Sequence, residues 1–308
     1  MVKFGFFKTN DPAFGSDEDG AVMDLKSGNL IFQMVPMGGR RMASVMGPDG
    51  QDCRVIIESP QVVAFSDRVL GWIDKSGPVD TPISQDRFVQ PLPAGARLVF
   101  DMKAVSSGRT DIVLETARGG NVGTLQVTVK NSRPVKVSAC RLIDLEFSNP
   151  FDDLKIRATM ARAIDVFRNC ANVSLLYDSV VHRVECDIGL GNPIVLGRKL
   201  TEFNSELSTI FEHIVRKTPP AAKTADVIAI YGWDFELTNE PIAGLNSGKF
   251  CFVEFNMDAS ARSRTLEHEI GHALKLEHTQ VKSIMNGDGF DRLERFEADQ
   301  IEKLNPNF

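Results

Sequence analysis

The chain has 308 residues, of which 43% are hydrophobic, and a formal net charge of −6 at pH 7. This length suits two domains with sizeable cores, and this composition argues against an intrinsically disordered chain. The negative charge argues against a nucleic-acid-binding protein, which needs a basic surface to neutralise phosphates.

Residues 1 to 50 contain short apolar runs among glycines, such as Leu30–Val35, and predict short strands and loops packed on the domain that follows. The apolar run after Met1 is far too short for a signal peptide. No later stretch approaches the roughly 20 apolar residues of a membrane span. We therefore expect no membrane span, and a protein that is cytoplasmic or exported by a leader-independent route, with secretion favoured.

Residues 51 to 140 predict an antiparallel, β-sandwich-like domain, because short strand candidates alternate there with turn residues. These candidates are Arg54–Glu58, Gln61–Phe65, Arg97–Asp101, Thr110–Thr116 and Gly123–Lys130. Three roles remain open for this domain: a module that binds a target or a delivery machinery, a pro-region over the active site, or a platform without a ligand.

Residues 141 to 308 alternate strand and helix patterns, which predicts an α+β domain with a mixed sheet and helices packed on one side. The strand candidates are Arg141–Phe147, Asp226–Tyr231 and Lys249–Phe255. The helix candidates are the segment with Ile156, Met160, Ile164 and Phe167 on one face, the segment Thr201–Arg216, and the closing segment Arg292–Leu304.

Five cysteines are spread along the chain without a C-x-x-C pair, so they indicate neither a second metal site nor a redox motif. At most two disulfides could form, and a reduced chain is equally compatible. His182 and His213 stand outside the motif described next, and we expect them to be surface or packing residues.

The most informative stretch is His268-Glu269-Ile270-Gly271-His272, which His278 and Met285 follow. Residues four apart lie on one face of a helix, so His268 and His272 can present both rings to one metal. Glu269 can reach a metal-bound water without binding the metal. His278 would then be the third ligand and would leave a fourth position open for water.

HEIGHALKLEH with the following Ser-Ile-Met resembles the extended zinc motif and Met-turn of the metzincin metalloendopeptidases. Among them it is most similar to the matrixins, because Thr279 follows the third histidine. The resemblance implies that the three histidines bind Zn²⁺, that Glu269 is the general base, and that Met285 lies under the site. It also implies a metzincin-like catalytic domain over residues 141–308 that hydrolyses a protein or peptide substrate.

Lys275 departs from the family pattern, which has glycine at this position because the chain must turn there. A lysine with a positive φ costs on the order of 1 kcal/mol, and a zinc site can absorb this cost. If the turn is built differently, Glu277 or a later carboxylate would replace His278 as the third ligand.

In metzincins the strand before the zinc helix lies at the sheet edge and pairs with the extended substrate. Here this strand would contain Gly244, Leu245 and Gly248, unless the glycines merely form a turn, and the segment Asn286–Arg295 would wall the pocket. The sequence therefore predicts a zinc endopeptidase, and the role of a secreted or delivered effector or toxin remains open. A zinc amidase acting on cell-wall peptides and a non-catalytic zinc-containing binding protein remain as alternatives.

Overall fold

A computed structural model of the protein describes residues 3–6, 22–24, 30–46, 50–65, 89–92, 94, 97–144, 152–201, 204–238, 240–280, 283–287 and 296–306. The fold is mixed α+β, with several sheets and few helices. The chain forms two compact units. Unit 1 comprises Met1–Arg133, Arg168–Val173 and Glu294–Phe308, and unit 2 comprises Pro134–Phe167 and Ser174–Leu293.

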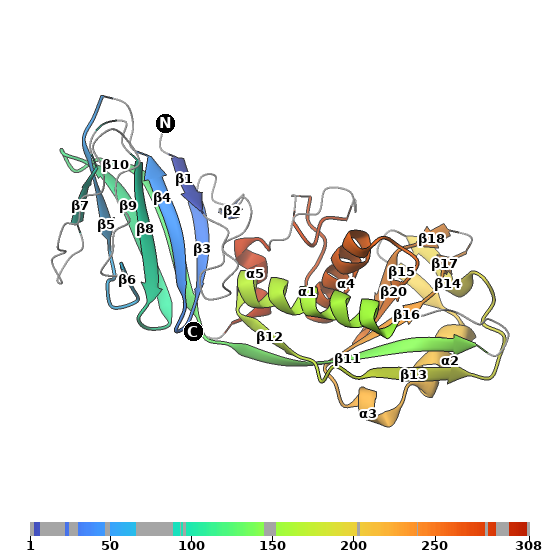
Figure 1. The fold of residues 1–308 in the computed structure, drawn as a ribbon. Coiled ribbons are helices and arrows are strands. Elements are labelled where there is room, and N and C mark those ends of the chain that lie inside the picture. The colour runs from blue at the N-terminus through green and yellow to red at the C-terminus, as the bar shows by residue number, and fades with distance from the viewer. Residues whose placement is uncertain are drawn as a thin grey trace. The chain divides into compact units, whose positions relative to one another are not determined.

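Two sheets make up the body of unit 1 (Figure 1). The four-stranded sheet contains, in order, β1 (Lys3–Phe6), β4 (Arg40–Met46), β8 (Arg97–Ala104) and β6 (Val63–Phe65). The six-stranded sheet contains, in order, β2 (Val22–Asp24), β3 (Leu30–Pro36), β10 (Asn121–Lys130), β9 (Gly108–Thr116), β5 (Cys53–Ile57) and β7 (Val89–Leu92). Each of the five strand candidates in residues 51–140 is thus confirmed.

Both sheets contribute to one apolar core, which includes Val45 and Met102 from one sheet and Val55, Leu114 and Val127 from the other. Burial of this apolar surface holds the sheets together. The described strands that pair with one another within residues 51–140 are antiparallel, as predicted. Residues 1–50 also supply strands to both sheets, and one of these strands, β3, pairs with β10 in parallel.

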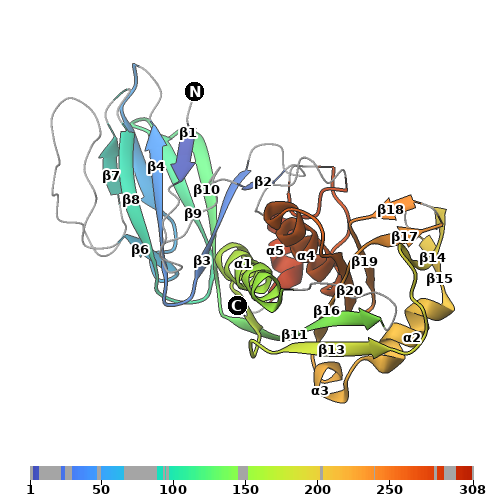
Figure 2. The same ribbon diagram turned by 45° about the vertical axis from the view of Figure 1, so that its right-hand side comes forward.

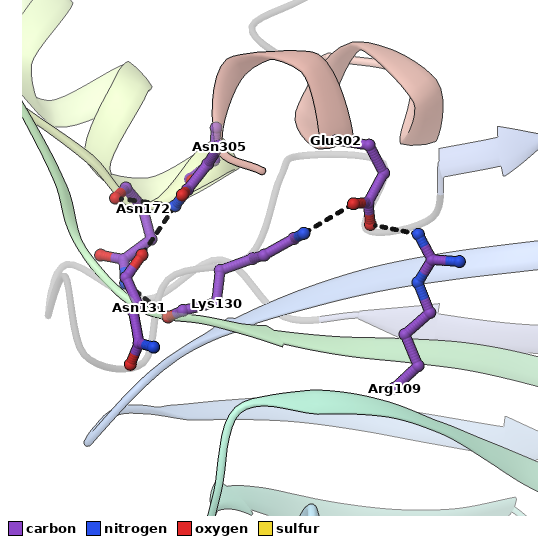
Figure 3. A network of polar contacts seen from close by, with 7 residues as sticks. Arg109, Lys130, Asn131, Asn172, Glu302 and Asn305 are labelled. Carbon is purple, nitrogen blue, oxygen red and sulfur yellow. Dashed lines mark hydrogen bonds and ion pairs between the residues drawn. The ribbon is translucent and has the colours of Figure 1, made fainter. Parts of the chain in front are cut away.

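A polar network joins the C-terminal helix α5 (Ala298–Leu304) to unit 1 (Figure 3). Lys130 has a fully buried side chain, and its Nζ donates to Glu302 Oε2 at 2.6 Å. Arg109 lies 2.9 Å from the other oxygen of Glu302. The Asn305 side-chain amide donates to the carbonyl of Asn131 at 2.7 Å. The two ion pairs with Glu302 are charge-assisted, and they fix α5 on β9 and β10.

The units differ in extent from the domains that the sequence predicts. The boundary lies at Arg133 instead of residue 140, and residues 1–50 form sheets together with the following segment. Glu294–Phe308 belongs to unit 1, although the sequence placed it in the domain of the histidine motif. The Glu302 network is the physical reason, because it gives the closing helix polar partners on strands far away in the sequence.

In the main sheet of unit 2, five strands lie side by side in the order β12 (Val173–Leu176), β11 (Arg133–Asp144), β16 (Val227–Gly232), β20 (Phe250–Glu254) and β19 (Gly244–Ser247). A further strand, β13 (Val181–Cys186), also pairs with β11. The pairs β13–β11, β11–β16 and β16–β20 are parallel, whereas β19 is antiparallel to β20. The predicted mixed sheet is therefore confirmed, and β16 is buried along its whole length.

The helices of unit 2 are α1 (Asp153–Ala171), α2 (Thr209–Lys217), α3 (Pro220–Lys223) and α4 (Ala259–Ala273). The predicted apolar face of α1 is buried at Ile156, Met160 and Phe167. In Figures 1 and 2, α1 and α4 lie on one face of the main sheet, while α2 and α3 lie toward the other. The expectation of helices on one side only was therefore wrong.

The predicted helix Thr201–Arg216 was wrong in its first half. A hairpin occupies that segment, with β14 (Ile194–Thr201) antiparallel to β15 (Asn204–Leu207). Ser208 then starts α2, because its side chain accepts a hydrogen bond from the Phe211 amide at 3.2 Å. The hairpin belongs to a second sheet of unit 2, in the order β15, β14, β17 (Phe235–Leu237) and β18 (Glu240–Ile242).

In the described part of the chain, no helix is both long and apolar enough to cross a membrane. All five cysteines are buried and none forms a disulfide, so the structure corresponds to the reduced chain rather than to one with disulfides. The closing helix was predicted to span Arg292–Leu304. Residues 292–295 lie outside the described residues, and the helix starts at Ala298, so residues 296 and 297 are not helical.

Candidate metal centre

Helix α4 carries the first two histidines of the motif. Asp258 caps its N-terminus, where the carboxylate accepts hydrogen bonds from the amides of Ser260 and Ala261, each at 2.9 Å. These bonds hold the pKa of Asp258 below its ordinary value. Ten residues further, His268 is buried, and His272 stands one turn later on the same face.

The three motif histidines converge on one point. The Nε2 atoms of His268 and His272 lie 3.0 Å apart, and His278 Nε2 lies 3.1 Å and 3.0 Å from them, respectively. Zinc with bonds of about 2.05 Å to tetrahedral ligands places these atoms about 3.3 Å apart. The three ring nitrogens therefore lie almost at the separation that one small cation requires.

The other ring nitrogens show how these rings could hold a cation. His268 Nδ1 donates to the carbonyl of Ile284 at 2.8 Å, and His272 Nδ1 donates to the carbonyl of Leu276 at 2.9 Å. A carbonyl only accepts, so in both neutral rings the proton is on Nδ1 and the lone pair is on Nε2. Two lone pairs that face each other across 3.0 Å repel unless a cation or a proton lies between them. This donor set fits zinc and other divalent ions that prefer imidazole.

Lys275 makes the turn that returns the chain to the first two histidines. Its φ is +74°, so it takes the left-handed conformation that the sequence predicts for this position. The Leu276 amide donates to the Gly271 carbonyl at 2.9 Å and ends the helix. Within the described residues the group that could hold a metal consists of the three histidines, and Glu277 has no place in it.

Met285 is fully buried beneath this helix, since a Cβ added at Gly271 would strike its sulfur. The Met285 carbonyl accepts from the Thr279 amide at 3.0 Å, and the Met285 amide donates to Ser283 Oγ at 3.1 Å. The same turn supplies the Ile284 carbonyl that orients His268. Sequence reasoning missed this role of Ile284, because no side-chain signal marks a backbone acceptor.

Glu269 is 6% exposed and faces the edge strand β19. An added Cβ at Gly244 would lie 2.8 Å from Glu269 Oε1. Gly244 and Leu245 are half-buried on that strand. Gly248 lies in the turn after β19 and has a φ of +61°. For this residue, the turn that the sequence analysis named as the alternative is therefore the correct description. Residues 288–295 of the predicted pocket wall lie outside the described residues.

Glu267 is a buried carboxyl beside the centre that the sequence analysis did not single out. Its side chain is fully buried, and Arg162 Nε lies 3.8 Å from its Oε1. Burial raises the pKa of Glu267 to about 7, while Arg162 opposes the rise. No sequence signal marks this residue, because a glutamate on a helix is normally exposed.

The other histidines take no part in this group. His213 is buried on α2, where its Nε2 lies 3.1 Å from Asp187 Oδ1 and Arg216 donates to its Nδ1 at 3.0 Å. It is a packing residue, as predicted. His182 lies on β13.

No protein-family model matches this chain, and no curated protein matches its sequence. Among solved structures, the DNA-binding domain of C. elegans Cep-1 has 8% identity and a TM-score of 0.25 over 42% of this chain and 89% of that one. A multicopper oxidase has 11% identity and a TM-score of 0.23 over 41% of this chain and 42% of that one. The C-terminal domain of the Streptococcus agalactiae AgI/II polypeptide BspA has 11% identity and a TM-score of 0.22 over 42% of this chain and 49% of that one. Similarity at this level supports no inference about fold or function.

Proposed function

We propose that this protein is a zinc-dependent endopeptidase of the metzincin type, most similar to the matrixins. One observation carries the proposal: two histidine rings with their Nε2 lone pairs fixed inward converge with a third ring, and Glu269, which follows His268 on the same helix, is buried. A helix face whose histidines have no role would not need carbonyl acceptors that fix the tautomers.

The sheet of unit 2 adds support. The metzincin resemblance implies an edge strand before the zinc helix, able to pair with an extended peptide. Strand β19 ends the sheet path, is antiparallel to β20, and precedes α4 in the chain. Among the described strands, no other pairs with its outer side, so a peptide could add there as a further strand.

The residues of the site would divide the work of hydrolysis. His268, His272 and His278 would hold the zinc. When bound, zinc makes a coordinated water acidic near neutral pH and polarises the scissile carbonyl. Glu269 would take the proton of the attacking water and deliver it to the leaving amine. The carbonyls of Ile284 and Leu276 would keep the first two rings in the metal-binding tautomer.

Replacement of Glu269 tests this function. In Glu269→Gln, cleavage of casein should fall by about 10³-fold or more, because the water loses its proton acceptor. Zinc content, measured by elemental analysis, should stay at one equivalent. Glu277→Gln is the matched control, since this exposed carboxylate lies outside the histidine group, and it should cleave like the parent.

Four results would contradict the proposal. One is a Glu269→Gln protein that cleaves as fast as the parent, and another is a parent without bound metal. The third is chelator-sensitive digestion of peptidoglycan without digestion of casein, which would assign the site to an amidase of cell-wall peptides. Bound zinc without turnover of any peptide library would identify a non-catalytic binding protein.

A further inference from the structure

Gly244 on the edge strand lies directly against the helix that carries the histidines. A Cβ added at Gly244 would lie 2.6 Å from Thr265 Cγ2, 2.8 Å from Glu269 Oε1 and 3.0 Å from Glu269 Cγ. Carbon atoms in favourable contact are about 3.5–4.0 Å apart. The space beside the Glu269 carboxylate is therefore available only because residue 244 has no side chain.

The strand cannot move away to make room for a methyl group. Gly244 is paired with Val253, which is fully buried on β20, and the Glu254 amide donates to the Ala243 carbonyl at 2.9 Å. Farther along the strand, the Asn246 side-chain amide donates to the Phe250 carbonyl at 3.2 Å and links β19 to β20 across the turn. A shift of β19 would break this ladder.

The helix is equally constrained, and two of its side chains face Gly244. Thr265 and Glu269 are four residues apart, so they present one face of α4 to the strand. Thr265 is 4% exposed, and its short β-branched side chain is restricted to two χ1 rotamers in a helix. The Glu269 carboxylate is the end of a longer side chain with more rotatable bonds. An added methyl would therefore displace this carboxylate first.

We propose that Gly244 is a positioning residue: its bare Cα forms the wall that sets the place of the Glu269 carboxylate. The proposal rests on the proposed function, in which Glu269 transfers the proton. It gives the edge strand a task besides pairing with substrate, because the same residue that lies along the peptide path limits where the general base can lie.

Gly244→Ala tests the proposal together with the double variant Gly244→Ala/Thr265→Ser. The second change removes Thr265 Cγ2, which is the nearer contact, and leaves the contact with Glu269. We expect kcat to fall by about 10²-fold in both variants, since a displacement near 1 Å has this effect. KM and zinc affinity should change by less than about threefold. Thr265→Ser alone is the matched control and should keep the parent kcat.

Thermal unfolding separates positioning from packing. The double variant should regain the Tm of the parent while its kcat stays low. The proposal is overturned if kcat recovers together with Tm, or if a folded Gly244→Ala protein keeps the parent kcat within about twofold. If the single variant does not fold, the comparison of the double variant with Thr265→Ser decides.

A measurement that needs no substrate separates the test of the positioning role from the test of the proposed function. In the Co²⁺-loaded protein, the pH titration of the absorption bands reports the ionisation of metal-bound water. Gly244→Ala should shift its midpoint in the same direction as Glu269→Gln. A parent that cleaves nothing would refute the endopeptidase, yet this shift would still support the contact. An unshifted midpoint in Gly244→Ala, with a shifted one in Glu269→Gln, would refute the positioning role alone.

Discussion

Gly271→Ala offers the sharpest test of the packing under the histidines. Alanine in place of a glycine inside a helix stabilises the helix by about 1 kcal/mol, because alanine has the higher helix propensity. Here its Cβ would strike the sulfur of Met285 and would lie 3.2 Å from Met285 Cε. Overpacking of a core costs about 1–3 kcal/mol. Because Met285 is fully buried and held by its backbone bonds, we expect the overpacking cost to exceed the helix gain, with a net loss of up to about 2 kcal/mol.

Hydrogen exchange of the α4 amides measures this loss within unit 2 alone. A double-mutant cycle identifies its cause: Met285→Ala should cost about 2–5 kcal/mol in the parent, but distinctly less in the Gly271→Ala background, where the clash disappears. A coupling energy of about 1 kcal/mol or more is expected. A Gly271→Ala protein more stable than the parent, or strictly additive changes, would refute the reasoning.

Two further predictions concern other residues. Lys275→Gly should stabilise unit 2 by about 0.5–1 kcal/mol, because release from a positive φ outweighs the conformational entropy of glycine; an unchanged or lower Tm would contradict this. Glu302→Gln should destabilise unit 1 by about 3 kcal/mol at pH 7, because it leaves the buried Lys130 ammonium without its carboxylate. Burial already lowers the pKa of Lys130, so Lys130 in the folded variant should lose its ammonium proton as the pH rises toward 10. The difference in unfolding free energy between parent and variant, measured by urea unfolding, should then shrink. A deficit that does not change with pH would rule out this explanation.

Local patterns predicted much of the fold. The strand candidates of unit 1, the apolar face of α1 and the buried strand β16 follow from side-chain periodicity, which depends only on neighbours in the sequence. The same reasoning failed at Thr201–Arg216. There the apolar spacing also suits a strand hairpin, and the Ser208 cap marks the true start of the helix.

The sequence could not predict how distant segments pair. The parallel pairing of β3 with β10 joins segments about 90 residues apart, and neither strand carries a mark of its partner. The attachment of α5 to unit 1 depends likewise on Lys130, whose charge would ordinarily indicate an exposed position. Its burial is acceptable only because Glu302 arrives from the other end of the chain.

The residue types and spacing of the candidate site were present in the sequence alone. The shared helix face of His268 and His272 follows from helix geometry, and the acid at Glu269 is read directly from the sequence. The left-handed turn at Lys275 was an expectation from the family resemblance alone, because backbone sterics disfavour it for a lysine. Only the tertiary structure decided the rest. The Ile284 carbonyl that fixes a tautomer, the Met285 sulfur under Gly271 and the Gly244 backbone against Glu269 are contacts between separate elements, and such contacts arise from packing, which no local pattern encodes.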